Sequence, residues 1–313
     1  MQNKIKLILD EMKNVIVGKQ DVVEKLLISI FANGHVLLDD VPGVGKTTMA
    51  VAISRILGLK YRRVQFTPDV LPSDITGFSI YNRQTGKLEY MPGAALDANI
   101  LLGDEINRTS SKTQSALLEA MEEGQVTVDG TTHALQKPFI VIATQNNVGT
   151  AGTQLLPYAQ LDRFLVRLSI GYPDFESQIE IIRDRQKTNP VDSVRQIITC
   201  DDVLAMQFEV LDVTVKDSIL AYITQLAVSS RENQMIELGI SPRGAISVCR
   251  AAKARAYLHG RDYVVPEDVL EIFTDVCSHR VIINQKAKAK QFTAEQVLKS
   301  VMAEVKVPDS LKS

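Results

Sequence analysis

A glycine-rich turn lies between a short apolar run and a helical pattern, and it limits the folds that this chain can adopt. The run HVLLDD (35–40) predicts a strand and residues 47–57 predict a helix, so the turn VPGVGKTT leads from a strand into a helix N-terminus. Backbone N–H groups of such a turn converge on phosphate oxygens, and the helix N-terminus adds partial positive charge. The sequence therefore predicts a phosphate-binding loop. Its expected contact residues are Pro42, Gly43, Val44, Gly45, Lys46, Thr47 and Thr48.

Two side chains of this loop have separate expected roles. Lys46 would reach the β- and γ-phosphates of ATP, and the Thr47 hydroxyl would be a ligand of Mg²⁺. One position departs from the usual pattern G-x-x-x-x-G-K-[ST], because Asp40 stands where the first glycine is expected. The departure concerns only the start of the loop, since the turn around Gly43 and Gly45 is kept.

The first half of the chain alternates β-rich runs with helical patterns. Strands are expected at 35–40, 61–66, 99–105, 139–144 and 165–171, and helices at 47–57, 112–123 and 176–185. This alternation predicts a five-stranded parallel sheet covered on both faces, an α/β sandwich of three layers, αβα. Two segments, 78–91 and 125–135, are expected to form hairpins that project from the finished sheet, where contacts to other molecules are often made.

The second half contains only segments of helical period. A polar stretch with Pro190 precedes it, so we predict a nucleotide-binding core at 1–190 and a small all-helical domain at 191–313. Helices are expected near 201–211, 216–228, 243–258 and 267–279. A last helix should follow Thr293, whose spacing to Gln296 fits a capping box.

Adjacent carboxylates follow the third expected strand, where parallel sheets of this kind bind ligands. Asp104 would hold Mg²⁺, and Glu105 would act as the general base on the attacking water. The strand FIVIAT leads to Asn146, whose amide can orient that water. Two arginines, Arg163 on an expected short helix before the fifth strand and Arg243 at the start of a later helix, are candidate partners of a transferring phosphoryl group.

Composition and cysteine spacing argue against several other classes of protein. A net charge of -2 argues against a dedicated nucleic-acid binder, and we expect neither a signal peptide nor a membrane-spanning segment, because Asp10 and Glu11 interrupt the first apolar run and no apolar run is long enough to span. Its three cysteines, Cys200, Cys249 and Cys277, have no C-x-x-C spacing, so neither a disulfide scaffold nor a zinc site is expected. These features predict a reduced, cytoplasmic protein.

The motifs VPGVGKTT, NILLGDEINR, ATQNN, LDRF and GISPRG, in this order, resemble those of AAA+ ATPases of the MoxR group. The resemblance implies that Asn146 is sensor 1, that Arg163 is an arginine finger donated to a neighbouring subunit, and that Arg243 is sensor 2 of the lid domain. It implies that 78–91 is the insert in helix 2 and that 125–135 is the hairpin before the sensor strand. Residues implied to cover the adenine are Ile16, Val17 and Gly18.

The resemblance also implies a partner and an assembly. The family forms hexameric rings and acts in chaperone-like remodelling or cofactor insertion into client proteins, often with a protein that bears a von Willebrand factor A domain. Two positions depart from the family pattern, which has glutamate where this chain has Tyr158 and commonly alanine where it has Gly103. The first departure bears on how the finger is presented.

Two other functions remain open from the sequence. A small-molecule kinase would also contain a phosphate loop, but its reaction does not require a water-activating residue such as Glu105 or an arginine from a neighbouring subunit. A nucleic-acid motor could use the hairpins as DNA fingers, and the first turn carries Arg83 and Lys87. That hairpin is short of aromatic residues, however, and no helix-turn-helix follows the helical domain.

Overall fold

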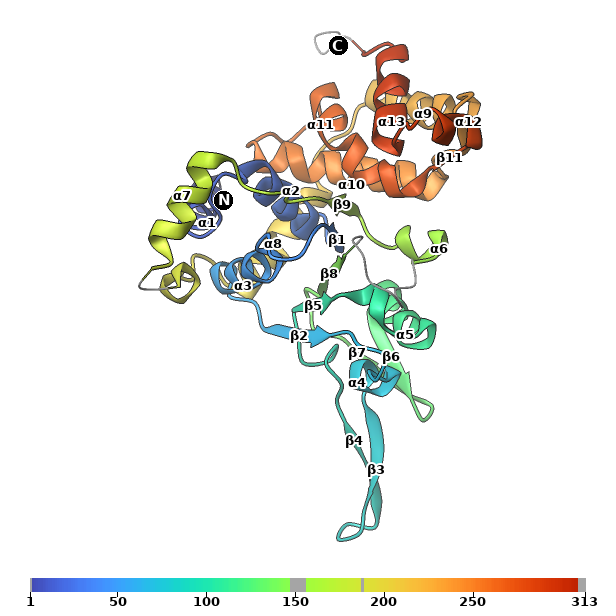
Figure 1. Cartoon of the computed structure of the whole chain (residues 1–313). Helices are drawn as coiled ribbons and strands as arrows, with labels where there is room; N and C mark the ends of the chain where they lie inside the picture. Colours follow the sequence, from blue (N-terminus) through green and yellow to red (C-terminus); the bar gives the residue numbers. More distant parts are fainter. Residues whose placement is uncertain (1, 147–155, 187–188, 309–313) are drawn as a thin grey trace.

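The computed structural model describes residues 2–146, 156–186 and 189–308. A five-stranded parallel sheet of order β2-β5-β8-β1-β9 forms its centre (Figure 1). The bounds of the strands are β1 (Val36–Asp39), β2 (Tyr61–Gln65), β5 (Ile100–Asp104), β8 (Ile140–Gln145) and β9 (Val166–Leu168). All five lie within the expected runs except that β8 extends one residue further, to Gln145, and the predicted parallel sheet is confirmed.

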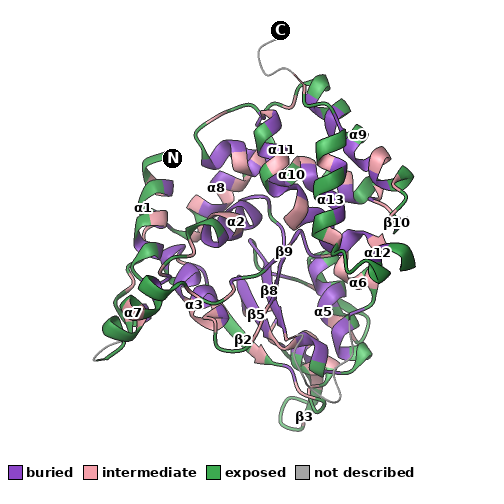
Figure 2. Cartoon of the chain, turned by 45° about the horizontal axis from the view of Figure 1, so that its top comes forward, coloured by how far each residue is buried: buried purple, intermediate pink, exposed green. Residues whose placement is uncertain are grey.

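The side chains of the central strands alternate between two buried layers. In β1, Val36 and Leu38 pack on the face that also buries residues of α1, α2 and α3, while Leu37 packs on the face of α5. Because both faces are covered, β1, β5 and β8 are buried along nearly their whole length, and each begins with a run of apolar residues (Figure 2). The bounds of these helices are α1 (Gln2–Lys13), α2 (Gln20–Phe31), α3 (Lys46–Ile56) and α5 (Ser111–Glu123).

Helices α1 and α2 were not among the expected elements. They precede the first strand and contribute buried residues such as Ile8 and Leu26 to the same core as α3. The first residues of the sequence show an amphipathic pattern, but this pattern alone does not distinguish a helix from a loop.

Both expected hairpins are present. Strands β3 (Phe78–Asn82) and β4 (Lys87–Met91) pair antiparallel, as do β6 (Gln125–Val128) and β7 (Thr131–Ala134). A short helix, α4 (Pro72–Thr76), precedes the first hairpin, which projects from the end of the molecule opposite the lid (Figure 1).

A helical lid follows the sheet domain. Its elements are α8 (Cys200–Leu211), α9 (Asp217–Glu232), α10 (Pro242–Leu258), α11 (Pro266–Cys277), the 3-10 turn η3 (Ser278–Arg280), α12 (Gln285–Ala289) and α13 (Ala294–Glu304). The capping box of Thr293 and Gln296 is confirmed. The expectation of helices alone was wrong, because β10 (Ile236–Leu238) and β11 (Ile282–Ile283) form a two-stranded antiparallel sheet. Strands this short carry too little periodicity to be recognised.

One contiguous core joins the two halves of the chain. Buried residues of α2 and α3 belong to the same hydrophobic cluster as buried residues of α8, α10 and α11. The boundary at 190/191 therefore stays a prediction from the sequence. No helix among the described residues has the length and apolar character needed to cross a membrane.

Candidate functional site

The phosphate loop joins β1 to α3 and leaves open space above its glycines. Gly43 and Gly45 have φ of +85° and +95°, a region that residues with a Cβ rarely adopt. A Cβ built on either glycine would have no neighbouring atom within 4 Å. Gly45 is also the N-cap of α3, so the free N–H groups of that helix begin at the loop. This cradle suits a phosphate group.

Lys46 lies buried at the bottom of the cradle. Its Nζ donates to the carbonyl of Asp40 at 2.9 Å and to Oδ1 of Asn146 at 2.6 Å. Burial lowers the pKa of Lys46 from its ordinary value, while the neighbouring carboxylates of Asp40 and Asp104 oppose that shift. Two residues predicted from separate motifs are therefore in contact. Lys46 follows β1 in the phosphate loop, and Asn146 follows β8.

The carboxylate pair lies at the same edge of the sheet. Asp104 is the last residue of β5, and Glu105 follows it with a φ of +58°. Thr144 of β8 ties both residues, because its hydroxyl donates to Oδ1 of Asp104 at 2.6 Å and accepts from the backbone N–H of Glu105 at 2.9 Å. The sequence reasoning missed Thr144, although its place in the strand just before Asn146 could have indicated it.

The Glu105 carboxylate accepts hydrogen bonds from three side chains. Asn146 Nδ2 donates at 2.6 Å, Arg108 Nη1 at 2.6 Å and Gln65 Nε2 at 3.1 Å. Asn146 thus bridges Lys46 and Glu105. Arg63, which was also missed, pairs with Asp104 at 2.7 Å. Gln65 was missed as well. It lies with Arg63 on β2, whose register with β5 places Gln65 opposite Asp104.

The departure at Asp40 has a structural explanation. Its carboxylate accepts hydrogen bonds from the backbone N–H groups of Val41 at 2.8 Å and Gly171 at 2.6 Å, and from the Ser169 hydroxyl at 3.0 Å. Burial would raise the pKa of Asp40, but the hydrogen bonds from Gly171 and Val41 outweigh burial and lower it. The aspartate therefore fixes the start of the loop to the segment after β9.

The expected adenine segment, Ile16, Val17 and Gly18, lies beside the same segment. Lys19 Nζ donates to the carbonyl of Tyr172 at 2.9 Å. Gly18 has a φ of +72°, and a Cβ there would lie 2.2 Å from Oγ of Ser177, in the first turn of α7 (Phe175–Asp184). The close approach of α7 therefore requires glycine at position 18.

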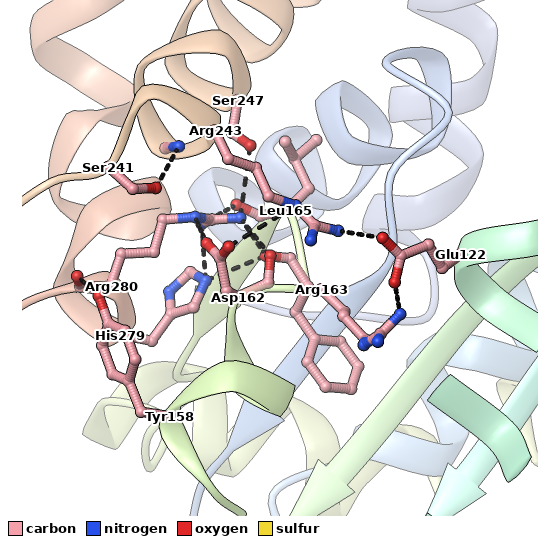
Figure 3. Close-up of polar contacts among 12 residues, drawn as sticks. Glu122, Tyr158, Asp162, Arg163, Leu165, Ser241, Arg243, Ser247, His279 and Arg280 are labelled. Carbon is pink, nitrogen blue, oxygen red and sulfur yellow. Dashed lines mark hydrogen bonds and ion pairs between the residues drawn. The ribbon is translucent and has the colours of Figure 1, made fainter. Parts of the chain in front are cut away.

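The two arginines form a second cluster. Arg163 pairs with Glu122, and Arg243 pairs with Glu122 at 3.4 Å and with Asp162 at 3.6 Å (Figure 3). One detail of the sequence prediction was wrong, because Arg163 lies in a turn just after the short helix α6 (Tyr158–Leu161) and not on it. A cavity of about 260 Å³ opens here. Its lining includes Gly34, Glu122, Asp162, Arg163, Leu165 and Arg243.

The two clusters lie at opposite edges of the sheet. Ser169, after β9, contacts Asp40 of the phosphate loop, whereas Leu165, before β9, lines the arginine cavity. These residues are four apart in an extended segment, which separates the edges by about 13 Å along the strands. An arginine side chain reaches only ~6–7 Å from its Cα. The structure therefore brings Arg243 to Arg163 and not to Lys46 of its own chain.

Comparison with known proteins identifies the family of this chain. Residues 35–166 match the family described as ATPase family associated with various cellular activities (AAA), and residues 228–301 match the AAA lid domain. The chain is 38% identical over 307 residues to Chaperone MoxR1 of Mycobacterium tuberculosis, covering 95% of this chain and 81% of that protein. This chain belongs to the MoxR family of AAA+ ATPases.

Two further relatives cover nearly all of this MoxR-family chain. The uncharacterized protein YeaC of Bacillus subtilis is 48% identical over 96% of this chain and 93% of its own length. A crystal structure of a Cytophaga hutchinsonii protein proposed to be an ATPase superposes with a TM-score of 0.90 at 40% identity, covering 98% of this chain and 96% of that one. The expected family, the nucleotide-binding fold with its lid, and ATP hydrolysis as the activity are thereby confirmed.

Proposed function

We propose that this MoxR-family ATPase works as a ring in which each active site is shared between two subunits. The phosphate loop and the Asp104–Glu105 pair come from one subunit, and Arg163 and Arg243 come from its neighbour. The observation that carries the proposal is the placement of the two clusters at opposite edges of one sheet. A head-to-tail contact joins unlike edges, and its repetition closes a ring, for which a hexamer is the expected size.

Within one site the residues divide the work of phosphoryl transfer to water. Lys46 and the N–H groups of the loop would bind the β- and γ-phosphates, and Glu105 would take a proton from the attacking water. Asn146 suits the orientation of that water, because it already contacts both Lys46 and Glu105. Arg163 and Arg243 would offset the charge that develops on the transferred group. Val44 and Thr48 complete the loop, and Ile16 to Gly18 would cover the adenine.

The residues present fit magnesium. Thr47 and Asp104 would hold Mg²⁺, because hydroxyl and carboxylate oxygens are ligands that this cation prefers. A Mg²⁺ site of this kind uses one or two protein carboxylates together with substrate phosphates. Consistent with this, the described residues contain no group of three or more His, Cys, Asp or Glu side chains arranged to hold a metal by themselves. Bound there, the cation would neutralise part of the phosphate charge.

The work done with ATP is proposed to be chaperone-like remodelling of client proteins, or insertion of a cofactor or metal into them. A partner with a von Willebrand factor A domain and a cytoplasmic location are part of this proposal. Support comes from the similarity to a protein named as a chaperone, Chaperone MoxR1. A nucleic-acid motor is the second candidate, and a small-molecule kinase is disfavoured by the water-positioning pair of Asn146 and Glu105.

Capture of bound proteins tests this part of the proposal. A Glu105→Gln variant should bind ATP without hydrolysing it and so retain its client, whereas Lys46→Ala should not. Affinity purification in ATP should recover client or partner proteins with Glu105→Gln in excess over Lys46→Ala. Recovery of DNA or RNA in place of protein would favour the nucleic-acid motor, and equal recovery with both variants would contradict an ATP-dependent client complex.

A further inference from the structure

Arg280 is a buried arginine to which the proposed reaction gives no role. Its guanidinium donates to the carboxylate of Asp162 at 2.8 Å and to the main-chain carbonyls of Phe164 at 2.7 Å and Leu165 at 3.0 Å (Figure 3). These residues flank Arg163 on both sides. The Arg280 side chain belongs to the lid and is only 1% exposed. It is therefore hydrogen-bonded to the segment that carries Arg163, the proposed arginine finger.

A second contact joins the same two segments. The hydroxyl of Tyr158, the first residue of α6, donates to the main-chain carbonyl of Arg280. Burial, with a smaller contribution from Asp162, raises the pKa of Tyr158 to about 12. Tyr158 is the position where the family pattern has glutamate. Both ends of the short segment from Tyr158 to Leu165 are therefore bound to η3.

The charged groups around Arg280 form a chain of alternating sign. The Asp162 carboxylate contacts Arg280 through Oδ1 and Arg243 through Oδ2. The Glu122 carboxylate then contacts Arg243 through Oε1 and Arg163 through Oε2. Arg280 is the buried end of this chain, and the two arginines proposed to act on a neighbour's phosphate are both more exposed than Arg280.

We propose that Arg280 is a positioning residue that holds Arg163 and Arg243 in fixed relation, so that lid and finger act on the neighbour as one unit. The proposal rests on the shared site of the proposed function. Buried donors fix geometry strongly, because any displacement leaves a guanidinium N–H without a partner. A displacement of about 1 Å at a reacting group can cost ~10²-fold in rate.

The test compares two lid arginines that each pair with an aspartate, the buried Arg280 and the half-buried Arg255. Arg280→Met removes the donors and keeps similar bulk. Arg255→Met is the matched control, because Arg255 pairs with Asp268 at 2.6 Å at the opposite end of α11 from η3. We expect Arg280→Met to lower kcat between ~10- and ~100-fold while the Kd for ATP stays within about 2-fold, since the phosphate loop lies at the other edge. Arg255→Met should lower the melting temperature but keep kcat.

Mixed assemblies separate positioning from misfolding. Lys46→Ala subunits carry an intact Arg163, so adding them to Arg280→Met subunits should restore part of the activity. The double variant Lys46→Ala/Arg280→Met should fail to restore Arg163→Ala subunits, because it brings a displaced finger. The single Lys46→Ala variant should restore hydrolysis by Arg163→Ala subunits. That result tests the shared site and does not depend on the role of Arg280.

Two results would overturn the proposal. One is a kcat of Arg280→Met equal to that of Arg255→Met, and the other is a parallel loss of ATP affinity and kcat. If Arg280→Met does not fold, Tyr158→Phe is measured in its place, since it removes only the hydroxyl that donates to the Arg280 carbonyl. It should lower kcat several-fold at unchanged ATP affinity, and an unchanged kcat would exclude the positioning role.

Discussion

Arg163 and Arg243 contact the two oxygens of a single carboxylate, that of Glu122. One residue belongs to the sheet domain and the other to the lid, so the carboxylate joins both domains at the edge opposite the phosphate loop. A γ-phosphate likewise offers several oxygens to a pair of guanidinium groups. In the proposed ring, these three charged groups are where a neighbour's nucleotide would enter.

We predict that nucleotide promotes assembly. A site that needs a neighbour's arginines gains ligand contacts when subunits associate, so ATP binding and association must be linked. Light scattering should show a rise in mass on addition of a non-hydrolysable ATP analogue, and a smaller rise for Arg163→Ala. A protein that stays monomeric at saturating analogue would count against the ring.

We predict different defects for the two residues at the carboxyl edge of the sheet. Lys46→Ala removes the cation beneath the phosphate cradle and should abolish ATP binding. Glu105→Gln keeps the cradle and the contacts of Lys46 intact, so it should bind ATP and retain it unhydrolysed. Binding measured with a fluorescent ATP analogue, next to phosphate release, distinguishes the two. Equal loss of ATP affinity in both variants would refute the division of roles.

Much of this carboxyl-edge site could be predicted from sequence because its parts are local. The phosphate loop, Asp104, Glu105 and Asn146 each lie at the carboxyl end of a mostly apolar strand, and parallel strands bring these ends to one edge. Thr144 and Gln65 escaped notice because polar residues within strands have no distinctive spacing. Their roles appear only when the register of β2, β5 and β8 is known.

The arginine cluster was much harder to predict. Its members come from α5, the turn after α6, α10 and η3, and their contacts depend on where the lid docks. Local patterns specify helices but not their docking, so the sequence did not indicate that Arg243 lies beside Arg163 or that Arg280 is buried. The strands β10 and β11 were missed for a related reason, because each is too short to show a period.

We predict that the β3–β4 hairpin is dispensable for folding. Several of its apolar side chains are exposed, including Tyr81 and Leu88, so removal of the tip uncovers little core. Replacing residues 81–88 by a short glycine-serine turn should leave the melting temperature and basal ATP hydrolysis mostly unchanged. Any response of the ATPase to client or partner should be lost. Unfolding of the domain would show that the hairpin is core structure.

We predict that stability falls between pH 7 and pH 5 through His35. The Nδ1 of His35 accepts from the N–H of Val141 at 3.0 Å, and Nε2 lies 3.1 Å from the carbonyl of Met121, which fixes the neutral ring. Burial lowers the pKa of His35 to about 4. Below its ordinary pKa of about 6.5 the unfolded chain binds the proton first, which removes about 2 kcal/mol of unfolding free energy by pH 5.

Denaturant unfolding at several pH values measures this effect. His35→Gln can keep both hydrogen bonds without titrating, so its stability should vary less between pH 7 and pH 5. Burial lowers the pKa of His279 well below its ordinary value, so His279 still makes stability depend on pH when His35 is replaced. A His35→Gln slope equal to that of the parent would contradict the assignment.

Arg163 is proposed to serve the active site of another subunit, and mixing two inactive variants can show whether it does. Arg163→Ala should bind ATP nearly normally and hydrolyse it on the order of 10³-fold more slowly, whereas Lys46→Ala cannot bind ATP but still carries the finger. In mixtures shown by native mass spectrometry to co-assemble, some sites join an intact phosphate loop to an intact Arg163. We expect partial recovery of hydrolysis that depends on the ratio of the two variants. Absence of any recovery would show that Arg163 acts within its own chain or only supports the structure.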